Sequence, residues 1–424
     1  MWHGHLIITP YYFIFQPRPS LMRFSLFTFF SLLLTHIPAV AASTAAPADQ
    51  QAQFLKSFNQ HVSALLADKS IPGGAYAIIK DDQVVEVKTF GHLDMQAEQP
   101  VTPDTVFRLA SVSKPFAATI TTMLAHEKQL DLDAPITQYV PEFHLATPGA
   151  AKKIKVKHVL SHTTGLVPNA YDNLLHEKWS MEKVIRRFER VVPVCQPAQC
   201  YGYQNIAYGF LEPAIEQSQQ QSYEALLEQR LFTPLGMANA SLGLEKFRQA
   251  KNSAKPHVLI NRVNTGKKDR NGKAIKSYVW RTVKVTPDYY KVATAAGINA
   301  SITDLSKWLI ANLGHAPKVL TPALIAELTE PRIRTRKDLK RKHWRDYLED
   351  AHYGYGWRIY QFKDYPIIYH SGWVQGFRAD IGYSPTLGVG FAVLINAESN
   401  SISEISTEFW SQAYKLADEK PAKS

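Results

Sequence analysis

The sequence predicts an α+β fold, close to an α/β sandwich, in which one antiparallel sheet is built from the N- and C-terminal segments. Three observations predict it: strand patterns occur near both ends of the 424-residue chain, helical patterns fill most of 131–250, and apolar helices adjoin the strands at both ends. These helices would flank the sheet and cover its faces, with a mostly helical subdomain inserted at about 130–295. A hydrophobic share of 45% fits a globular protein with a large core.

The individual elements follow from local periodicity. Apolar residues at helical spacing predict a helix over 49–68, and two strand patterns around Asp81-Asp82 predict a hairpin. The hairpin strands are expected at 74–80 and 84–90, further strands at 365–372, 377–385 and 389–397, and further helices at 113–127, 181–191, 222–231 and 402–416. This arrangement puts a cleft between the sheet and the helical lobe, where ligands tend to bind.

The N-terminus has the layout of a leader. Arg23 precedes an apolar run over 24–34, and Ala39-Val40-Ala41 supplies a small-residue cleavage site. Residues 1–41 are therefore predicted to be a secretory signal peptide, with Met22 as a candidate true start. The alternative is an uncleaved anchor, although the run is too short to span a bilayer. We expect a periplasmic or secreted protein with no stable membrane span after cleavage.

The rest of the chain is expected to form one large domain. A short linker is predicted at 42–54, the domain at 55–418 and a tail at 419–424. Cys195 and Cys200 are its two cysteines, and in an oxidising compartment they are predicted to form a disulfide rather than two free thiols. So short a loop constrains the unfolded chain little, so the expected effect is to stiffen the loop just before Tyr203.

The positive charge is concentrated in two basic segments. The net charge is +11, and the leader contributes Arg18 and Arg23 without any acid. Residues 251–291 hold eleven Lys or Arg against two Asp, and residues 331–345 hold eight against one, so the remainder is acidic. This pattern predicts attraction to an anionic partner, which outside the cytoplasm means a wall or envelope polymer or lipid headgroups. Solvated loops without a partner are the alternative, and no nucleic-acid-binding motif is present.

Ser111 and Lys114 form a Ser-x-x-Lys pair at the start of a predicted helix. This spacing places the hydroxyl and the amine on one helix face, where a partly desolvated lysine can activate the serine as a nucleophile. Helix capping by Ser111 is the alternative. The same spacing recurs at Ser180 and Lys183, where a capping serine is the favoured interpretation.

Two further groups carry polar chemistry. Tyr203-Gln204-Asn205 supplies a phenol that can act as a general base and an amide that can orient the lysine and the substrate. Tyr171-Asp172-Asn173 has the same spacing but lies in an expected loop. His370-Ser371-Gly372 ends a predicted strand, where small residues let a substrate lie along the edge and a following N–H can complete an oxyanion hole. A core tyrosine and a strand-end histidine are the structural alternatives.

These motifs resemble, in kind and order, those of the serine β-lactamase-like superfamily, which contains class C β-lactamases, penicillin-binding DD-peptidases, D-aminopeptidases and related esterases. The resemblance covers about 55–415. The segments that carry it are RLASVSKPF, LSHTTGL, YGYQNIAYGFL, LFTPLGM, AAGINASITDLSKWL, YGYGW and HSGWVQGF. It implies a β-lactamase/transpeptidase-like fold and a small peptide, a β-lactam or an ester as substrate.

The resemblance also implies a role for each matching residue. Ser111 would be the acyl-forming nucleophile, Lys114 its activating amine and Tyr203 the general base and then acid. Asn205 would position the lysine and the substrate amide, and the backbone N–H groups of Ser111 and Trp373 would bind the oxyanion. Ser113 falls at a variable position before the lysine.

His370 departs from the β-lactamase pattern. Enzymes of that type usually carry a lysine at this position, and histidine there is similar to certain DD-peptidases and D-aminopeptidases. Because histidine is often uncharged near neutral pH, it anchors a substrate carboxylate less well. The sequence therefore favours peptidase or esterase action over efficient β-lactam hydrolysis.

A non-catalytic binder of an anionic wall polymer on the same fold is the competing hypothesis. The presence of Ser111, Lys114, Tyr203 and Asn205 argues against it. Other hydrolase motifs are absent from the sequence, since neither a Gly-x-Ser-x-Gly elbow nor a His-Glu-x-x-His metal site occurs. No metal ion or organic cofactor is expected.

Overall fold

A computed structural model describes residues 47–268, 270–272 and 274–418. The predicted leader at 1–41 and the tail at 419–424 lie outside the described residues. Helix α1 (Pro47–Asp68) confirms the helix predicted at 49–68 and overlaps the second half of the predicted linker at 42–54. The Gln and Ala residues of that stretch are good helix formers, and they extend the helix beyond the apolar positions that predicted it.

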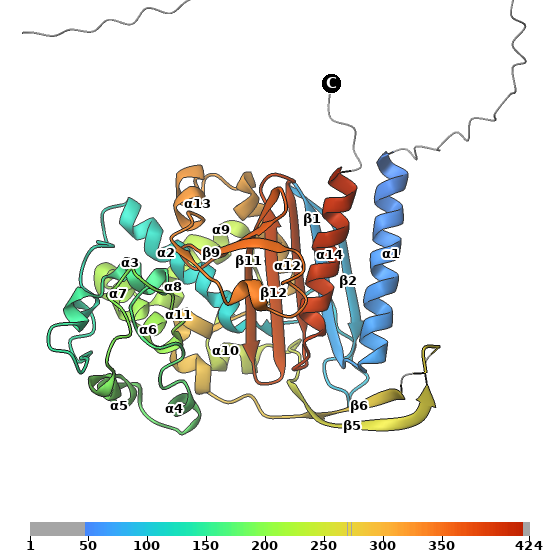
Figure 1. Cartoon of the computed structure of the whole chain (residues 1–424), viewed down its shortest axis with the longest axis horizontal. Coiled ribbons are helices and arrows are strands. Elements are labelled where there is room, and N and C mark those ends of the chain that lie inside the picture. Colours follow the sequence, from blue (N-terminus) through green and yellow to red (C-terminus); the bar gives the residue numbers. More distant parts are fainter. Residues whose placement is uncertain (1–46, 269, 273, 419–424) are drawn as a thin grey trace, which may run out of the picture. The chain divides into compact units, whose positions relative to one another are not determined.

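One eight-stranded sheet joins the two ends of the chain, as predicted (Figure 1). Strand β1 pairs antiparallel with β13, and Ala77 lies opposite Ala392. The strands run in the order β2-β1-β13-β12-β11-β10-β9-β8. The predicted strands are confirmed as β1 (Gly73–Lys80), β2 (Gln83–Gly91), β11 (Tyr365–Val374), β12 (Phe377–Ser384) and β13 (Val389–Ile395).

Three strands at one edge of the sheet were not predicted. They are β8 (Ile333–Arg334), β9 (Leu348–Tyr353) and β10 (Arg358–Phe362). All are short, and charged or polar residues interrupt the alternation that marks a half-buried strand. They enter the sheet in succession, since β10 pairs with β11, β9 with β10 and β8 with β9, and this tertiary contact leaves no local signal.

Helices cover both faces of the sheet. Helix α1 lies beside α14 (Ser401–Asp418) on one face, and α2 (Ser113–His126) and α12 (Ile302–Ile310) lie on the other (Figure 1). Side chains of strand β1 alternate between the two faces. Tyr76 and Ile78 belong to the core beneath α1 and α14, and Ala77 and Ile79 belong to the core beneath α2 and α12. No helix in the described part of the chain is both long enough and apolar enough to cross a bilayer.

The insertion between the two halves of the sheet is mostly helical. The predicted helix at 181–191 is α5 (Met181–Arg186) followed by η4 (Arg187–Arg190), and that at 222–231 is α8 (Tyr223–Leu227) followed by the π-helix η5 (Glu228–Phe232). The other helices there are η2 (Ile136–Gln138), η3 (Ala151–Lys153), α3 (Val156–Leu160), α4 (Asn173–His176), α6 (Asn205–Gly209), α7 (Leu211–Gln219), α9 (Thr233–Leu235), α10 (Leu244–Gln249), η6 (Asp288–Lys291) and α11 (Ala293–Ala296).

The insertion also contains strands that the sequence analysis did not predict. A separate hairpin consists of β5 (His257–Lys268) and β6 (Ala274–Thr282). A small sheet joins β4 (Ser241–Leu242) of the insertion to β3 (Phe107–Arg108) and β7 (Ile298–Ala300), which lie outside it. Outside the insertion lie η1 (Ala110–Val112), the π-helix η7 (Ala311–His315), α13 (Pro322–Leu328) and η8 (Asp338–Lys340).

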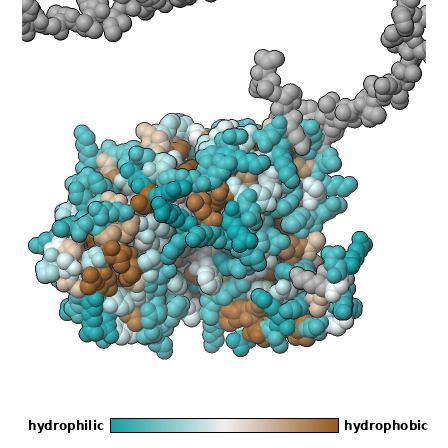
Figure 2. Space-filling model, viewed as in Figure 1, coloured by the Kyte–Doolittle hydropathy of each residue, from teal (hydrophilic) through white to brown (hydrophobic). Residues whose placement is uncertain are grey.

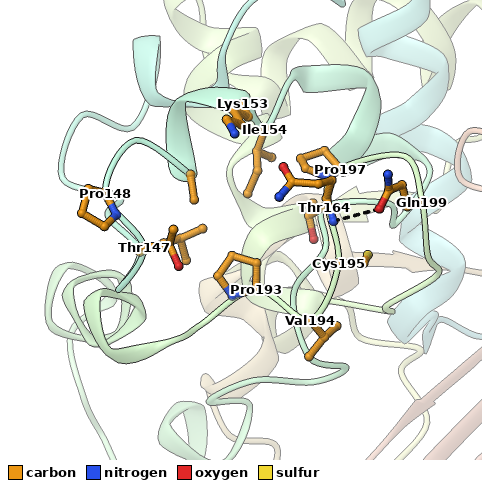
Figure 3. A pocket seen from close by; sticks show the side chains of 13 residues that line it. Thr147, Pro148, Lys153, Ile154, Thr164, Pro193, Val194, Cys195, Pro197 and Gln199 are labelled. Carbon is orange, nitrogen blue, oxygen red and sulfur yellow. Dashed lines mark hydrogen bonds between the residues drawn. The ribbon is translucent and has the colours of Figure 1, made fainter.

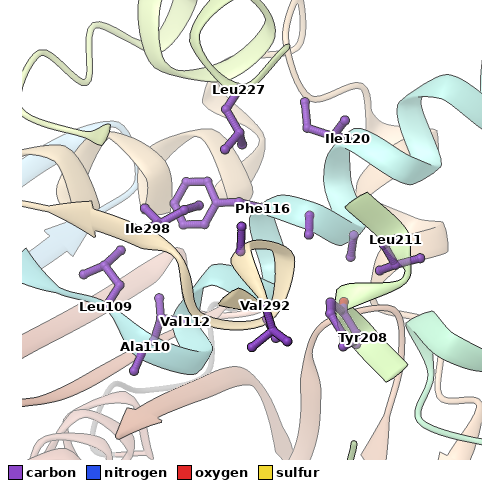
Figure 4. Packing of buried hydrophobic residues seen from close by; sticks show 14 of the residues in the cluster. Leu109, Ala110, Val112, Phe116, Ile120, Tyr208, Leu211, Leu227, Val292 and Ile298 are labelled. Carbon is purple, nitrogen blue, oxygen red and sulfur yellow. The ribbon is translucent and has the colours of Figure 1, made fainter. Parts of the chain in front are cut away.

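Helix α2 is held by aromatic packing behind its polar N-terminus. Phe116 is fully buried and stacks on Trp308 of α12, with ring centroids 4.1 Å apart. Figure 4 shows the Phe116 ring next to Ile298, inside the apolar cluster that surrounds α2. This packing fixes the helix that carries Lys114 relative to the sheet.

We predict that Phe116→Ala destabilises the protein by about 3–5 kcal/mol, because it leaves a cavity against Trp308. Urea unfolding followed by tryptophan fluorescence measures the change. Val84→Ala is the control, since Val84 is 45% exposed and should change stability by less than about 0.5 kcal/mol. Equal losses for the two variants would contradict this packing.

Candidate active site

Ser111 lies in η1, a short turn between β3 and α2. Ala110 just before it has a φ of +50°, a left-handed conformation that costs a non-glycine residue about 1–3 kcal/mol. Strand β11 packs directly against this turn. A Cβ on Gly372 would stand 2.1 Å from the Leu109 carbonyl oxygen. The absence of a side chain at Gly372 therefore lets β11 close on the turn that presents Ser111.

The Lys114 side chain is fully buried and lies at the centre of the site. Its Nζ is 3.4 Å from Ser111 Oγ, 2.7 Å from Asn205 Oδ1 and 3.1 Å from the Ala295 carbonyl oxygen. Burial lowers the pKa of Lys114 well below its ordinary value of 10.5. The Lys114 amine is therefore much easier to deprotonate than a surface lysine.

The neighbours of Lys114 have structural roles. The Ser113 hydroxyl is buried and accepts a hydrogen bond from the Ile298 backbone N–H at 2.9 Å, so it holds β7. Pro115 lies in the first turn of α2, where a missing N–H is tolerated. The second Ser-x-x-Lys pair is a helix start, because Ser180 Oγ caps the N–H of Lys183.

Tyr203 and Asn205 face the same lysine. Lys114 Nζ lies 4.6 Å from the Tyr203 ring centroid, and the Tyr203 side chain is hydrogen-bonded to Ser111. Burial raises the pKa of Tyr203, while the Arg358 charge and the Ser111 hydrogen bond pull it down; the net shift is upward. Tyr203 is therefore a neutral phenol in the resting site.

Asp172 belongs to the site although the sequence analysis assigned it no role. Asn205 Nδ2 donates to Asp172 Oδ2 at 2.6 Å, which turns Asn205 Oδ1 toward Lys114. Burial raises the pKa of Asp172, and the Asn205 hydrogen bond and the Lys114 charge oppose that shift. The Tyr171-Asp172-Asn173 motif therefore does not supply a second general base. Its Asp172 carboxylate instead orients Asn205 of the Tyr203-Gln204-Asn205 motif.

His370 is neutral and hydrogen-bonded on both ring nitrogens. Nδ1 lies 3.0 Å from the Ser371 carbonyl oxygen, which can only accept, so Nδ1 carries the proton. Nε2 then accepts from the Tyr353 hydroxyl at 3.1 Å. Burial lowers the pKa of His370 well below 6.5, and the charges of Arg358 and Lys114 lower it further. His370 therefore supplies no cation to the site.

Arg358 on β10 places a cation beside Tyr203, where it is paired with Asp338. Its guanidinium carbon lies 5.6 Å from the Tyr203 ring centroid, and Nη1 is 2.6 Å from Asp338 Oδ2. The Arg358 charge lowers the pKa values of Tyr203, Lys114 and His370. The sequence analysis missed this residue, although it directly follows the YGYGW segment.

His162 of the LSHTTGL segment forms the back wall of the site. It is buried, and its ring centroid lies 4.2 Å from that of Tyr203 and 5.0 Å from that of Tyr353. Its Nδ1 accepts the Gln204 backbone N–H at 3.3 Å. Burial lowers the pKa of His162 well below 6.5, so this ring packs as a neutral group against the tyrosines.

Ser371 and Trp373 lie on the strand that borders Ser111. Ser371 is half-buried opposite Asp380, and Trp373 is opposite Arg378. The Trp373 side chain is 60% exposed, with the Arg378 guanidinium carbon 4.7 Å from its ring centroid. The Trp373 side chain thus lies at the surface, and the role predicted for this residue involves only its backbone N–H.

Cys195 and Cys200 form a disulfide, as predicted. The bridged loop is tied to the LSHTTGL segment, because the Ala198 N–H donates to the Thr163 carbonyl at 2.8 Å and the Gly202 N–H donates to His162 at 2.9 Å. These bonds connect the disulfide loop to the wall beside Tyr203.

A pocket of about 380 Å³ lies on the outer side of the disulfide loop, with Thr147, Thr164 and Pro193 on its walls (Figure 3). None of Ser111, Lys114 and Tyr203 lines it. The pocket is therefore separate from the catalytic group. Among the described residues, no cluster of three or more His, Cys, Asp or Glu is placed to hold a metal ion.

Comparison with known proteins identifies the family of this chain. The family model described as Beta-lactamase matches residues 58–408, and the chain therefore belongs to the β-lactamase family. Two solved structures share the fold: an octameric penicillin-binding protein homologue from Pyrococcus abyssi (TM-score 0.70, 24% identity, 86% of this chain and 77% of that one) and a class C β-lactamase (TM-score 0.65, 20% identity, 88% and 98%).

The curated relatives are matched over only part of their length. An unguisins hydrolase of Aspergillus campestris is 25% identical over 376 residues, and the protein flp of Staphylococcus aureus is 23% identical over 343 residues. The matches cover 86% and 79% of this chain but 65% and 61% of those proteins. The chain thus spans less than two thirds of the length of these relatives.

We predict that Arg358→Gln shifts the pH profile of the acylation rate, so that the rate rises at higher pH than in the wild type. The reason is that Arg358 lowers the pKa values of both Lys114 and Tyr203, so its loss raises both. Stopped-flow acylation between pH 5 and 10 measures the profile, and Arg358→Lys, which keeps the charge, should leave it close to the wild-type position. A uniform drop in rate with an unmoved profile would mean that Arg358 is only structural.

Proposed function

We propose that this protein is an exported serine hydrolase of the β-lactamase and penicillin-binding type that works through an acyl-enzyme on Ser111. The observation that carries the proposal is the fully buried Lys114 amine, held between Ser111 Oγ and Asn205 Oδ1. A lysine is buried in this way at a serine hydroxyl when its amine must lose a proton near neutral pH. Export rests on the predicted leader at 1–41.

Acylation begins with attack of Ser111 Oγ on the substrate carbonyl carbon. Two groups can take the hydroxyl proton, Lys114 at 3.4 Å and the hydrogen-bonded Tyr203. The lowered pKa of Lys114 and the raised pKa of Tyr203 favour Lys114 as the first acceptor. In this proposal Lys114, and not Tyr203 as expected from the sequence, is the general base for the first proton transfer.

Tyr203 then serves the leaving group and the water. Its hydroxyl gives a proton to the departing amine or alcohol, and the phenolate left behind takes one from the water that hydrolyses the acyl-Ser111 ester. Lys114 returns its proton to the departing Ser111 Oγ. Arg358 makes the required phenolate easier to form. The N–H groups of Ser111 and Trp373 are proposed to bind the oxyanion, since β11 lies against the turn that holds Ser111.

The substrate is proposed to be an amide or ester: a D-amino-acid peptide, a β-lactam or an ester. Neutral His370 cannot supply the permanent cation expected for efficient β-lactam hydrolysis, which favours peptides and esters. A hydrolytic reaction is also consistent with the hydrolase among the similar proteins.

A non-catalytic binder of an anionic envelope polymer is the second candidate. It would need only the basic segments at 251–291 and 331–345, and it gives no reason for a buried amine at a serine hydroxyl. Such a binder would hold wall material with an affinity that falls steeply with salt, without turnover.

We predict that a fluorescent penicillin or a fluorophosphonate labels the wild-type protein and that Ser111→Ala abolishes the label, because the nucleophilic oxygen is gone. Gel fluorescence detects the adduct, and peptide mass spectrometry places it. Ser180→Ala is the matched control: it removes the serine of the second Ser-x-x-Lys pair, which only caps a helix, and should label like the wild type.

The outcomes separate the two candidates. Labelling that survives Ser111→Ala would exclude Ser111 as the nucleophile. Failure of both probes on folded wild-type protein would favour the binder. A panel of nitrocefin, D-Ala-D-Ala peptides, D-amino-acid amides and p-nitrophenyl esters then assigns the substrate class.

A further inference from the structure

The β5–β6 hairpin is a separate two-stranded sheet that pairs with neither of the other sheets. It extends beneath α1, away from α2 and α6, which carry the catalytic group (Figure 1). A two-stranded hairpin is marginally stable alone in water. The hairpin therefore needs contacts with the body on at least one of its faces.

Those contacts use the inner face. Trp280 is 4% exposed and donates its Nε1–H to the Lys69 carbonyl at 3.0 Å, and Lys69 Nζ lies 5.0 Å from the Tyr278 ring centroid. Thr282 Oγ1 donates to Asp94 at 2.7 Å at the base of the hairpin. Because side chains alternate along a strand, the face opposite Tyr278 and Trp280 points away from the body.

The outer face carries aliphatic side chains in water. Val263 on β5 lies opposite Ser277 on β6. Ile275 lies two residues before Ser277 on β6 and therefore on the same face. Ile260, at the bulge, is 52% exposed, Val263 is 46% exposed and Ile275 is 37% exposed. Figure 2 shows brown hydrophobic surface along the lower right, where Figure 1 places the hairpin.

Cations occur on both faces of the hairpin: Arg262 and Lys276 share the face of Tyr278, and Arg281 lies on the outer face. Residues 257–282 hold seven Lys or Arg against one Asp. The exposed cations among the described residues of the hairpin are Arg262, Lys267, Lys268, Arg270, Lys276 and Arg281.

The other basic segment is different, because much of its charge is already bound within the protein. Arg332 lies 2.8 Å from Glu330, Arg334 lies 2.7 Å from Asp350, and Arg341 donates to the Tyr360 hydroxyl at 2.9 Å. The hairpin is therefore the better candidate of the two for an external anionic partner.

We propose that the β5–β6 hairpin docks this protein on an anionic lipid bilayer. Ile260, Val263 and Ile275 would enter the boundary between headgroups and acyl chains, and exposed cations of the hairpin such as Lys267 and Arg281 would contact lipid phosphates. A dissolved or wall-bound polyanion offers phosphates or carboxylates but no apolar phase for the three aliphatic side chains. The aliphatic residues therefore favour a bilayer over a polymer, and this proposal stands independently of the hydrolase activity.

The test compares sedimentation of the protein with vesicles of phosphatidylcholine alone and of phosphatidylcholine with 30% phosphatidylglycerol at low salt, with the same N-terminus in every variant. We expect preferential binding to the anionic vesicles. Lys267→Gln/Lys268→Gln should lower the partition coefficient about 30-fold, since each cation near such a surface contributes about fivefold. Val263→Ser/Ile275→Ser, which keeps every charge, should lower it about tenfold.

Arg336→Gln/Lys337→Gln is the matched control, because it removes two exposed cations from the other basic segment, and it should bind within about twofold of the wild type. Serine labelling should be equal in all four proteins, since these substitutions lie outside the catalytic group. Equal wild-type binding to the two kinds of vesicle would overturn the proposal. So would undiminished binding by Val263→Ser/Ile275→Ser, especially if that variant binds polyphosphate like the wild type, which would identify a polymer as the partner.

Discussion

The rest of the site depends on one constraint, the burial of the Lys114 amine. A charged ammonium in a protein interior costs several kcal/mol unless partners compensate for the lost water. Here the compensation is partial, with Ser111 Oγ, Asn205 Oδ1 and the Ala295 carbonyl around Nζ. The amine is therefore held in place but poorly stabilised as a cation, which is the condition for a lysine that accepts a proton from a serine.

Distant parts of the chain meet to build this environment. Helix α2 brings Lys114, α6 brings Asn205, and the carbonyl of Ala295 comes from α11, so three helices converge on one nitrogen atom. The sheet adds two more elements. Strand β11 presses on the nucleophile turn at Gly372, and β10 places Arg358 beside Tyr203. The Arg358 charge, paired with Asp338, lowers the pKa values of Tyr203 and Lys114, while His370 stays neutral.

Local periodicity was sufficient to predict the sheet that joins both ends of the chain. Motif spacing was sufficient to select Ser111, Lys114, Tyr203 and Asn205 as candidates, and the structure brings these four residues together. The sequence could not reveal Asp172, Arg358 or β8–β10. Asp172 matters only because the fold places it 2.6 Å from Asn205, and Arg358 only because β10 pairs with β11. Similarly, the hairpin at 257–282 was predicted as part of a helical insertion, since a bulge and polar residues break its alternation.

The most direct test of the account is the titration of Lys114 itself. Lysine labelled with ¹³C at Cε reports the protonation of each amine by NMR, and Lys114→Met identifies the signal of Lys114 by its absence. The account predicts a pKa well below the ordinary 10.5 in the folded protein. A Lys114 signal that titrates at or above 10.5 would show that the buried amine stays charged, and it would contradict the role of Lys114 as the acceptor of the Ser111 proton.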